Sequence, residues 1–130
     1  MHLGFHYNMI QVVNKYKHKS TPNDFYIGRG SVFGNPYTHL DGITKAQFEV
    51  ATREEAIEKY REWFNKERVN NPHMYAQLHL MLEVMTGWNP PEHGINLVCY
   101  CAPQACHGGV IKEYLESALA NHGQMLPPAN

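Results

Sequence analysis

The stretch INLVCYCAPQACHGGVIKEYL, residues 95–115, decides the fold of this chain. Residues 95–101 form an apolar run, which is typical of a central strand covered on both faces. From about Gly108, apolar residues recur at helical spacing, which predicts a helix. A strand followed directly by a helix indicates an α/β fold, in which ligands bind beyond the carboxyl ends of the strands. The intervening loop, CAPQACHGG, is therefore a predicted ligand segment.

The rest of the chain supplies the partners that such a strand needs. Further strands are predicted at residues 9–16 and 25–30, and further helices at residues 52–68 and 73–86. The first of these helices begins with a capping box, in which Thr52 accepts a backbone hydrogen bond and Glu55 reaches back. The order strand, strand, helix, helix, strand, helix predicts a small single-domain, Rossmann-like α/β sandwich. Its short sheet is expected to be at least partly parallel and flanked by helices.

The chain has 130 residues, which is the length of one domain. We expect a core over about residues 9–120 and a loose tail over residues 121–130. No segment approaches the ~20 apolar residues that a membrane span needs. The N-terminus lacks the features of a secretory signal, and three cysteines in tight clusters do not suit a secreted disulfide framework. These features predict a protein of the cytoplasm that does not enter a membrane.

Charge is nearly balanced, with a formal net charge of −1 at pH 7. This balance excludes a general electrostatic attraction for nucleic acid. The stretch NKYKHKS, residues 14–20, is a local exception, because its lysines and its histidine are able to meet phosphates. The alternative is a solvated loop, which is what short charged runs usually form.

The loop after the last strand holds all three cysteines and a histidine, and three interpretations are open. A zinc site would have a complete ligand set in Cys99, Cys101, Cys106 and His107, but two adjacent side chains rarely meet one metal. A nucleophilic cysteine of the phosphatase or rhodanese kind needs a basic residue at the end of the loop, and Lys112 comes a turn too late. Cys99 by itself is expected to pack as a small hydrophobe, whereas Cys101 suits packing and ligand binding equally.

The third interpretation, which we favour, is an anion site at the start of the last helix. Unpaired backbone N–H groups of Gly108, Gly109 and Val110 are expected to bind the anion, and the two glycines allow a close approach. His107 is expected to supply a proton or a hydrogen bond, because histidine titrates near neutral pH. Cys106 is the second candidate catalytic residue, since a helix terminus stabilises a thiolate. No cofactor is predicted, and zinc is kept as the alternative.

The loop after the second strand, GRGSVFGNPY at residues 28–37, is the other predicted ligand segment. Its Arg29 suits bidentate contacts to phosphate or carboxylate. Asn35 is expected either to offer its amide to a base or sugar edge or to serve only as a turn residue. Gly30 and Gly34 are counted among the ligand-binding residues with them. Three aromatic residues offer flat surfaces for stacking, namely Tyr26, Phe33 and Tyr37.

The two loops are predicted to converge. If the strands before them are parallel neighbours, both loops open at the same edge of the sheet. Arg29 and His107 are then expected to form opposite sides of one crevice.

These segments resemble a known family. The blocks RGSVFGNP, residues 29–36, and CYCAPQACHG, residues 99–108, look like those of the domain-of-unknown-function family 4326, which occurs in bacteria and bacteriophages. The resemblance covers about residues 11–116 and implies a small α/β domain of prokaryotic or phage source. The second block is also similar to the end of the domain-of-unknown-function family 488, which carries an arginine where this chain has Gly108. Gly109 stands where the resemblance implies an acidic residue.

Together these features predict an enzyme or enzyme-like domain that binds a nucleotide or a nucleic-acid component. Its partner is expected to be a small phosphorylated ligand or nucleotide, with nucleic acid as a further candidate. Action at an N-glycosidic bond needs a carboxylate, for which Asp24, Glu49 and Glu92 are candidates. One alternative is a non-enzymatic accessory protein that binds a host protein, and this predicts an exposed apolar patch away from the two loops. The other alternative is a zinc-stabilised domain.

Overall fold

The computed structural model describes residues 10–38, 48–49, 51–100 and 106–125. Its elements, in chain order, are β1 (Ile10–Asn14), β2 (Asp24–Tyr26), β3 (Tyr37–Thr38), β4 (Phe48–Glu49), α1 (Arg53–Asn70), α2 (Pro72–Thr86), β5 (Ile95–Cys99) and α3 (Gly108–Met125). All the predicted strands and helices are present, and the small α/β class is confirmed. Strands β3 and β4 were not predicted, because two-residue strands are too short to show a periodic pattern. They pair with each other in a separate parallel sheet.

The main sheet has the strand order β1-β5-β2, and both of its pairings are parallel. The apolar strand β5 lies in the centre, as its sequence predicted, with Ile10 of β1 opposite Ile95 and Phe25 of β2 opposite Leu97. Because the three strands run in the same direction, their last residues lie at one edge of the sheet. We call this edge, where β1, β5 and β2 end, the carboxyl edge.

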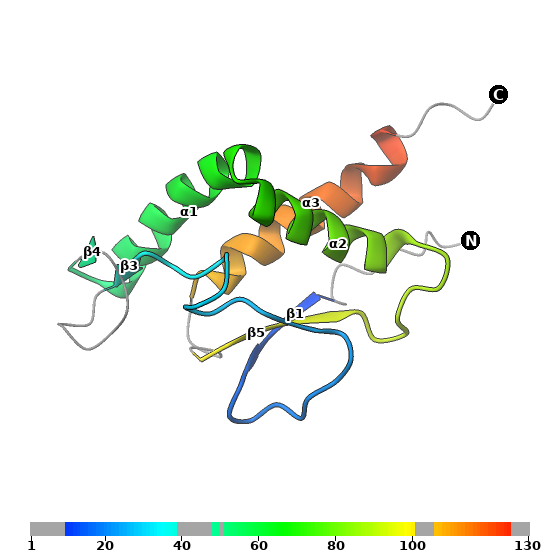
Figure 1. Ribbon diagram of the computed structural model, residues 1–130, viewed down its shortest axis with the longest axis horizontal. Coiled ribbons are helices and arrows are strands. Elements are labelled where there is room, and N and C mark those ends of the chain that lie inside the picture. The colour runs from blue at the N-terminus through cyan, green and yellow to red at the C-terminus, as the bar shows by residue number, and fades with distance from the viewer. Residues whose placement is uncertain (1–9, 39–47, 50, 101–105, 126–130) are drawn as a thin grey trace.

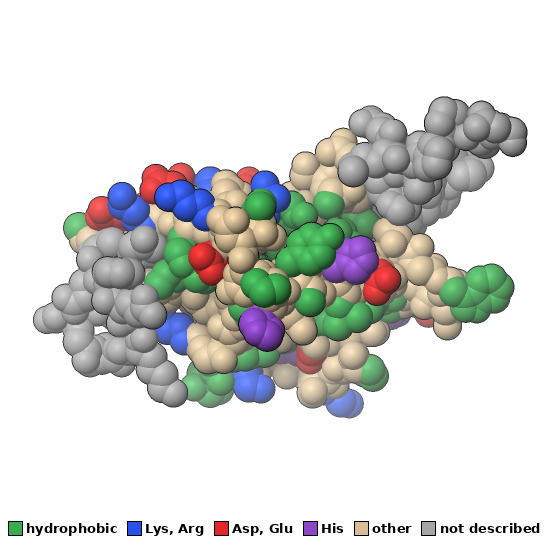
Figure 2. Space-filling view, turned by 45° about the horizontal axis from the view of Figure 1, so that its top comes forward, with side chains coloured by type: hydrophobic (Ala, Val, Ile, Leu, Met, Phe, Trp, Pro, Cys, Tyr) green, Lys and Arg blue, Asp and Glu red, His purple; other side chains and the backbone are tan. Residues whose placement is uncertain are grey.

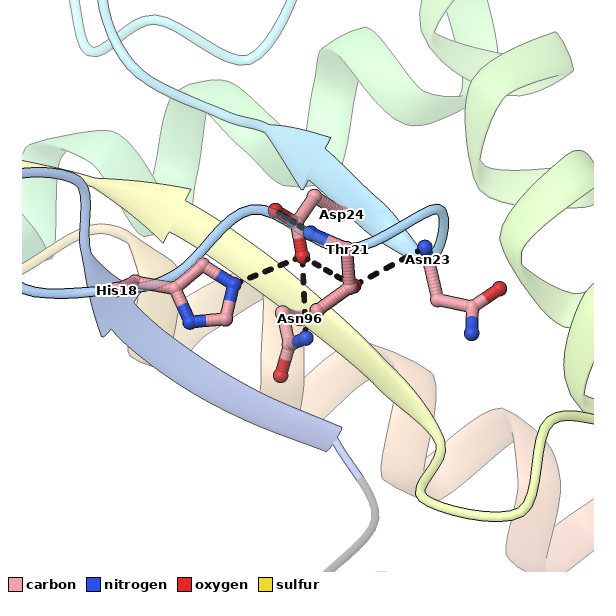
Figure 3. Close-up of polar contacts among 5 residues, drawn as sticks. All are labelled: His18, Thr21, Asn23, Asp24 and Asn96. Atoms are coloured by element: carbon pink, nitrogen blue, oxygen red, sulfur yellow. Dashed lines mark hydrogen bonds and ion pairs between the residues drawn. The ribbon is translucent and has the colours of Figure 1, made fainter.

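The three helices lie over one face of the main sheet, and the segment from Lys15 to Asn23 crosses its other face (Figure 1). Side chains point alternately to the two faces of a strand. On β5, Ile95, Leu97 and Cys99 are fully buried in the core shared with the helices. Asn96, between them, points to the face that the crossing segment covers (Figure 3).

Asp24 holds the crossing segment against the sheet (Figure 3). Its Oδ1 accepts hydrogen bonds from Asn96 Nδ2 at 3.1 Å and Thr21 Oγ1 at 2.8 Å, and lies 2.9 Å from His18 Nε2. Burial raises the pKa of Asp24, but hydrogen bonds from Thr21, His18 and Asn96 outweigh burial and lower the pKa to about 2. Asp24 begins β2, away from the carboxyl edge, so the expectation that it is a catalytic carboxylate is corrected to a structural role.

The caps of α1 and α2 follow from local sequence. Thr52 Oγ1 accepts the Glu55 N–H at 3.0 Å, and the Glu55 carboxylate accepts the Ala51 N–H at 3.1 Å, so the predicted capping box is confirmed. Asn71 ends α1 and caps α2, whose first position is Pro72. Proline suits this position because it has no N–H to leave unpaired.

The core lies between the sheet and the helices. Its largest fully buried side chains are those of Tyr60, Phe33, Phe64, Ile10, Ile27, Met74, Met81, Ile95, Leu97, Ile111, Leu115 and Leu119. Helix α3 continues to Met125, so the expectation of a loose tail was wrong for residues 121–125. Gly123 costs a helix only about 1 kcal/mol relative to alanine and does not end it. Residues 126–130 lie outside the described residues.

No helix in the described part of the chain combines the length and the apolar composition that crossing a membrane requires.

Candidate functional site

The carboxyl edge is built from the segments that follow the three parallel strands. After β1, Lys15 donates its backbone N–H to the carbonyl of Cys99 on β5 at 2.7 Å. After β2, Ile27 donates its N–H to the carbonyl of Val98 at 2.9 Å. Both segments are therefore tied to the end of the central strand, and Tyr100 emerges between them.

Residues 28–35, which we call the Arg29 loop, are held by bonds within the loop. Ser31 donates its N–H to the Gly28 carbonyl, and Gly34 donates its N–H to the Ser31 carbonyl, each at 3.0 Å. Gly30 has a φ of +100°, a conformation that side chains disfavour. A Cβ at Gly34 would lie 2.8 Å from the Cα of Arg29. The backbone of the loop therefore requires glycine at both positions, and the predicted role of Gly30 and Gly34 in ligand binding stays a prediction.

Arg29 and Asn35 close this loop. The Nε of Arg29 donates to the carbonyl of Asn35 at 2.9 Å. The side chain of Asn35 is buried, and its Nδ2 lies 3.4 Å from the carbonyl of Ala56 on α1. The amide that was expected to address a base or sugar instead fastens the loop to α1, so its expected ligand contact is corrected.

His107 joins the two predicted loops. Its Nε2 lies 2.6 Å from the carbonyl oxygen of Ile27, the residue that leads into the Arg29 loop. Since a carbonyl only accepts, Nε2 carries the proton. The contact joins the described end of the second loop to the start of the first, whereas residues 101–105 lie outside the described residues. The crevice with Arg29 and His107 on opposite sides stays a prediction. His107 is only 6% exposed, and burial lowers the pKa of its imidazole, a shift to which the positive charge of Arg29 adds. His107 is therefore neutral at neutral pH, and its catalytic role stays a prediction.

Tyr60 of α1 contacts both loops from the core. Its hydroxyl donates to the carbonyl of Phe33 in the Arg29 loop at 2.8 Å. Its ring packs edge-on against the imidazole of His107, with centroids 5.0 Å apart. Burial raises the pKa of Tyr60 well above its usual value, so the hydroxyl stays protonated and able to donate.

The start of α3 differs from the predicted anion site. The Gly108 N–H donates to Cys106 Sγ at 3.4 Å, and the Gly109 N–H donates to the Cys106 carbonyl at 3.1 Å. The Val110 N–H donates to the His107 carbonyl at 3.0 Å. These three donors already have acceptors, so the expectation that they stand open to an anion was wrong. Cys106 caps α3, because its sulfur accepts a backbone N–H that has no acceptor within the helix.

Cys99 and Cys106 lie together under this turn, with their Sγ atoms 3.5 Å apart. Both are buried free thiols. Cys101, predicted as a ligand residue and as a zinc ligand, lies outside the described residues. Among the residues that are described, no group of three or more histidine, cysteine or acidic side chains is placed to hold a metal. The zinc site thus stays an untested prediction.

A pocket of about 300 Å³ opens between the Arg29 loop and α2. It is lined by Tyr26, Ser31, Val32, Phe33, His73, Ala76 and Gln77. Tyr26 and Phe33, which were predicted as stacking surfaces, are both among these residues, but Phe33 is 2% exposed and its side chain packs in the core. The side chain of Tyr37, the third, lies outside the described residues.

The sequence did not single out the α2 residues of this pocket. His73 and Gln77 are four residues apart, so they share one side of the helix. The buried side of α2 packs in the core through Met74, Leu78 and Met81, and the sequence predicted this helix without assigning a role to its polar side. Nothing in the local pattern indicates that the polar side of α2 faces the Arg29 loop.

The fold and this edge define the class of the protein: a small α/β domain whose parallel strands end at a pocket and two linked loops. The chain belongs to the family described as a domain of unknown function, DUF4326, whose family model matches residues 10–117. The resemblance noted from the two sequence blocks is thereby confirmed. Neither a curated protein nor a solved structure matches the chain.

Proposed function

We propose that this domain binds a nucleotide, or another small phosphorylated ligand with a planar ring, in the pocket between the Arg29 loop and α2. The observation that carries the proposal is this pocket of about 300 Å³, directly beyond the end of β2. Ligand sites of α/β sheets lie in this position, and small-molecule pockets have volumes of roughly 300–1,000 Å³. The pocket thus lies where ligand sites of this fold class lie, and its volume is at the lower limit for binding a small molecule such as a nucleobase.

The lining of the pocket supports a planar, neutral, hydrogen-bonding group. Tyr26, which is 38% exposed, supplies aromatic surface on the side of the loop, whereas the side chain of Phe33 is buried in the core. The Ser31 hydroxyl donates to the Gly28 carbonyl at 2.7 Å and accepts from the Phe33 N–H at 3.2 Å, which leaves one lone pair for a ligand. The exposed amide of Gln77 offers both a donor and an acceptor, as the edge of a base needs.

Positive charge next to the pocket supports the phosphorylated half of the ligand. Arg29 belongs to the loop that forms one side of the pocket, and its positive charge opposes the rise that burial causes in the pKa of Tyr26. Lys15 and Lys17, in the turn after β1, add exposed ammonium groups at the same edge of the sheet. We place the phosphate on this side of the ligand.

The proposal is one of binding, with no assigned reaction. Asp24 is the first residue of β2 and Glu92 precedes β5, so both lie toward the other edge of the sheet. The side chain of Glu49 lies outside the described residues. The described carboxylates predicted as candidates therefore do not support action at an N-glycosidic bond.

Binding of the four ribonucleoside monophosphates, ribose 5-phosphate and inorganic phosphate, followed by NMR shifts and calorimetry, tests the proposal. We expect at least one monophosphate to shift signals of Ser31 and Gln77 and to bind more tightly than ribose 5-phosphate. Ala76→Leu fills the pocket and should weaken binding by roughly tenfold or more. Ala120→Leu, on the exposed side of α3, is the matched control and should change nothing. Equal binding by the wild type and Ala76→Leu would show that the ligand sits elsewhere.

A second candidate function, an accessory protein that binds a host protein, is favoured by the outer face of α2. Tyr75 and Leu80 are exposed there. Apart from two histidines, His73 and His79, the helix carries a single charged residue, Glu83. Figure 2 shows hydrophobic side chains and histidines together over α2, whereas charges of both signs crowd over α1. Leu80→Lys should abolish co-purification of a host protein if this function holds, and should leave nucleotide binding unchanged.

A further inference from the structure

Three exposed tyrosines gather at the carboxyl edge, one from the end of each parallel strand. Tyr16 follows β1, Tyr100 follows β5 and Tyr26 ends β2. The ring centroids of Tyr16 and Tyr100 are 5.1 Å apart, and those of Tyr26 and Tyr100 are 6.0 Å apart. The three residues are 83%, 46% and 38% exposed, in the order Tyr16, Tyr100, Tyr26. They therefore form a continuous row of aromatic surface that faces solvent.

Polar bonds beneath the row fix its backbone. Asn14 donates from Nδ2 to the Tyr100 carbonyl at 3.3 Å, and its Oδ1 accepts the Tyr16 N–H at 2.8 Å. At the other end, the Tyr26 hydroxyl donates to the Arg29 carbonyl at 2.9 Å. The backbone of Tyr16 and Tyr100 and the hydroxyl of Tyr26 are thus fixed before any ligand arrives, which lowers the entropy cost of binding.

The charge around the row is positive. The crossing segment carries Lys15, Lys17 and Lys19, all exposed, and its sequence from residue 15 to residue 23 contains no acidic residue. The nearest acidic residue along the chain, Asp24, is engaged by His18, Thr21 and Asn96. A chain with a formal net charge of −1 therefore concentrates cations beside its exposed aromatic row.

We propose that Tyr16, Tyr100 and Tyr26 form a stacking platform for successive bases of a single-stranded nucleic acid, whose phosphates meet the lysines of the crossing segment. Aromatic side chains beside a basic track are the combination that binds single strands, because every base has a face to stack. The inference rests on the proposed function in one respect: Tyr26 lines both the pocket and the platform. One base enters the pocket, and its neighbours along the strand continue over Tyr100 and Tyr16.

The geometry favours a single strand over a duplex. The angle between the ring planes is 53° for Tyr16 and Tyr100 and 76° for Tyr26 and Tyr100. The three rings therefore do not share a plane, and their faces point in different directions. Unpaired bases can turn to meet such faces one by one, whereas paired bases in a duplex keep their faces stacked on one another. The platform is therefore specific for unpaired strands and tolerant of sequence.

Fluorescence anisotropy with a labelled mixed-sequence oligonucleotide of about 12 nucleotides, as a single strand and as a duplex, tests the platform. We expect the single strand to bind more tightly than the duplex. Tyr16→Ala and Tyr100→Ala should each weaken its binding by roughly 5- to 100-fold, while Tyr16→Phe and Tyr100→Phe, which keep the rings, should retain most of it. Trp88→Ala removes a fully exposed aromatic residue before β5, at the other edge, and is the matched control that should change nothing.

Salt dependence tests the lysines separately from the rings. The slope of log affinity against log salt concentration should become less steep by about 0.7 for each lysine that meets a phosphate, so Lys15→Ala and Lys17→Ala are compared with the wild type. Polyphosphate serves as a polyanion without bases. If polyphosphate competes as well as the oligonucleotide and the alanine variants of the tyrosines bind normally, the site is only electrostatic and the platform is refuted.

The platform and the pocket can fail independently. Should monophosphates bind and respond to Ala76→Leu while the single strand binds no better than the duplex, the proposed function stands and the platform falls. Should the single strand depend on Tyr16 and Tyr100 while monophosphates fail to bind and Ala76→Leu has no effect, the platform stands and the pocket falls. Circular dichroism melting of every variant confirms that the fold is intact, which the high exposure of Tyr16 leads us to expect.

Discussion

The imidazole of His107 donates a hydrogen bond to the backbone carbonyl of Ile27, with Nε2 and O 2.6 Å apart across a separation of 80 residues in the chain. This contact joins the turn before α3 to the segment that leads into the Arg29 loop. It also explains why a polar residue is buried at this position, since the carbonyl it satisfies belongs to Ile27, whose side chain is fully buried. His107 therefore holds the segment after β2 against the start of α3, whichever ligand the carboxyl edge binds.

Replacing His107 with alanine should destabilise the fold. The variant leaves the Ile27 carbonyl without its donor and opens a space beside Tyr60, which together cost about 2–4 kcal/mol in the free energy of unfolding. His107→Gln should recover part of this loss, because its amide nitrogen can donate in place of Nε2. Urea denaturation of both variants measures the effect. A His107→Ala variant of normal stability that had lost ligand binding would instead support the direct catalytic role predicted from the sequence.

Mild acid should weaken the fold through the same histidine. Burial lowers the pKa of His107 in the folded state below the ordinary value of 6.5. A lowered folded pKa means that the unfolded chain binds the proton more readily. The stabilising contribution is thus complete above about pH 6.5 and is lost as the pH falls toward the folded value. Urea midpoints between pH 7.5 and pH 5 should decline more steeply for the wild type than for His107→Gln, and parallel declines would contradict this assignment.

Asp24 should stabilise the protein at neutral pH and cease to do so in strong acid. Its pKa falls from 3.8 to about 2 on folding, a difference worth about 2 kcal/mol. Because the folded pKa is the lower one, this stability is present above pH 3.8 and is lost as the pH falls toward 2. Asp24→Asn should therefore lower the free energy of unfolding at pH 7 by about that amount and differ little from the wild type near pH 2.

The exposed Glu92 provides the control for Asp24. Glu92→Gln removes a carboxylate from the loop before β5 and should leave the stability at pH 7 within about 0.5 kcal/mol of the wild type. If Asp24→Asn were equally harmless, the cluster shown in Figure 3 would not anchor the crossing segment.

The adjacent glycines at the start of α3 should respond oppositely to alanine. A Cβ at Gly108 would meet the Val12 side chain at 2.8 Å and that of Ile27 at 3.0 Å, so Gly108→Ala should cost about 1–3 kcal/mol by overpacking. A Cβ at Gly109 has no neighbour within 4 Å, and Gly109→Ala should stabilise the helix by up to about 1 kcal/mol. Thermal melting of the pair measures both signs. Loss of ligand binding in a stable Gly109→Ala variant would restore the predicted role of this glycine in ligand approach.

Several features of this protein were set by residues close together in the chain. The apolar run of residues 95–101 identified the central strand, and the Thr52 and Glu55 pair identified the start of α1. Such patterns are readable because strand periodicity and helix capping depend on neighbours within a few positions. The same reasoning placed two loops at one edge, since parallel strands must end together.

The partner of each polar group could not be predicted in this way. Asn35 and His107 resembled ligand-binding residues in their Gly-rich surroundings, yet one bonds to Ala56 on α1 and the other to Ile27. The pocket combines Ser31 with Gln77, and the platform combines Tyr16 with Tyr100, each pair drawn from separate elements.

The sequence by itself therefore determined the elements, their order and the edge at which a site would lie, because these follow from local periodicity and from the direction of the strands. Only the tertiary structure decided which polar side chains form hydrogen bonds within the fold and which side chains are exposed at the carboxyl edge. An apolar pattern indicates which residues of an element are buried, but the hydrogen-bond partner of a polar side chain belongs to a segment that it meets only in space, so short-range patterns do not identify that partner.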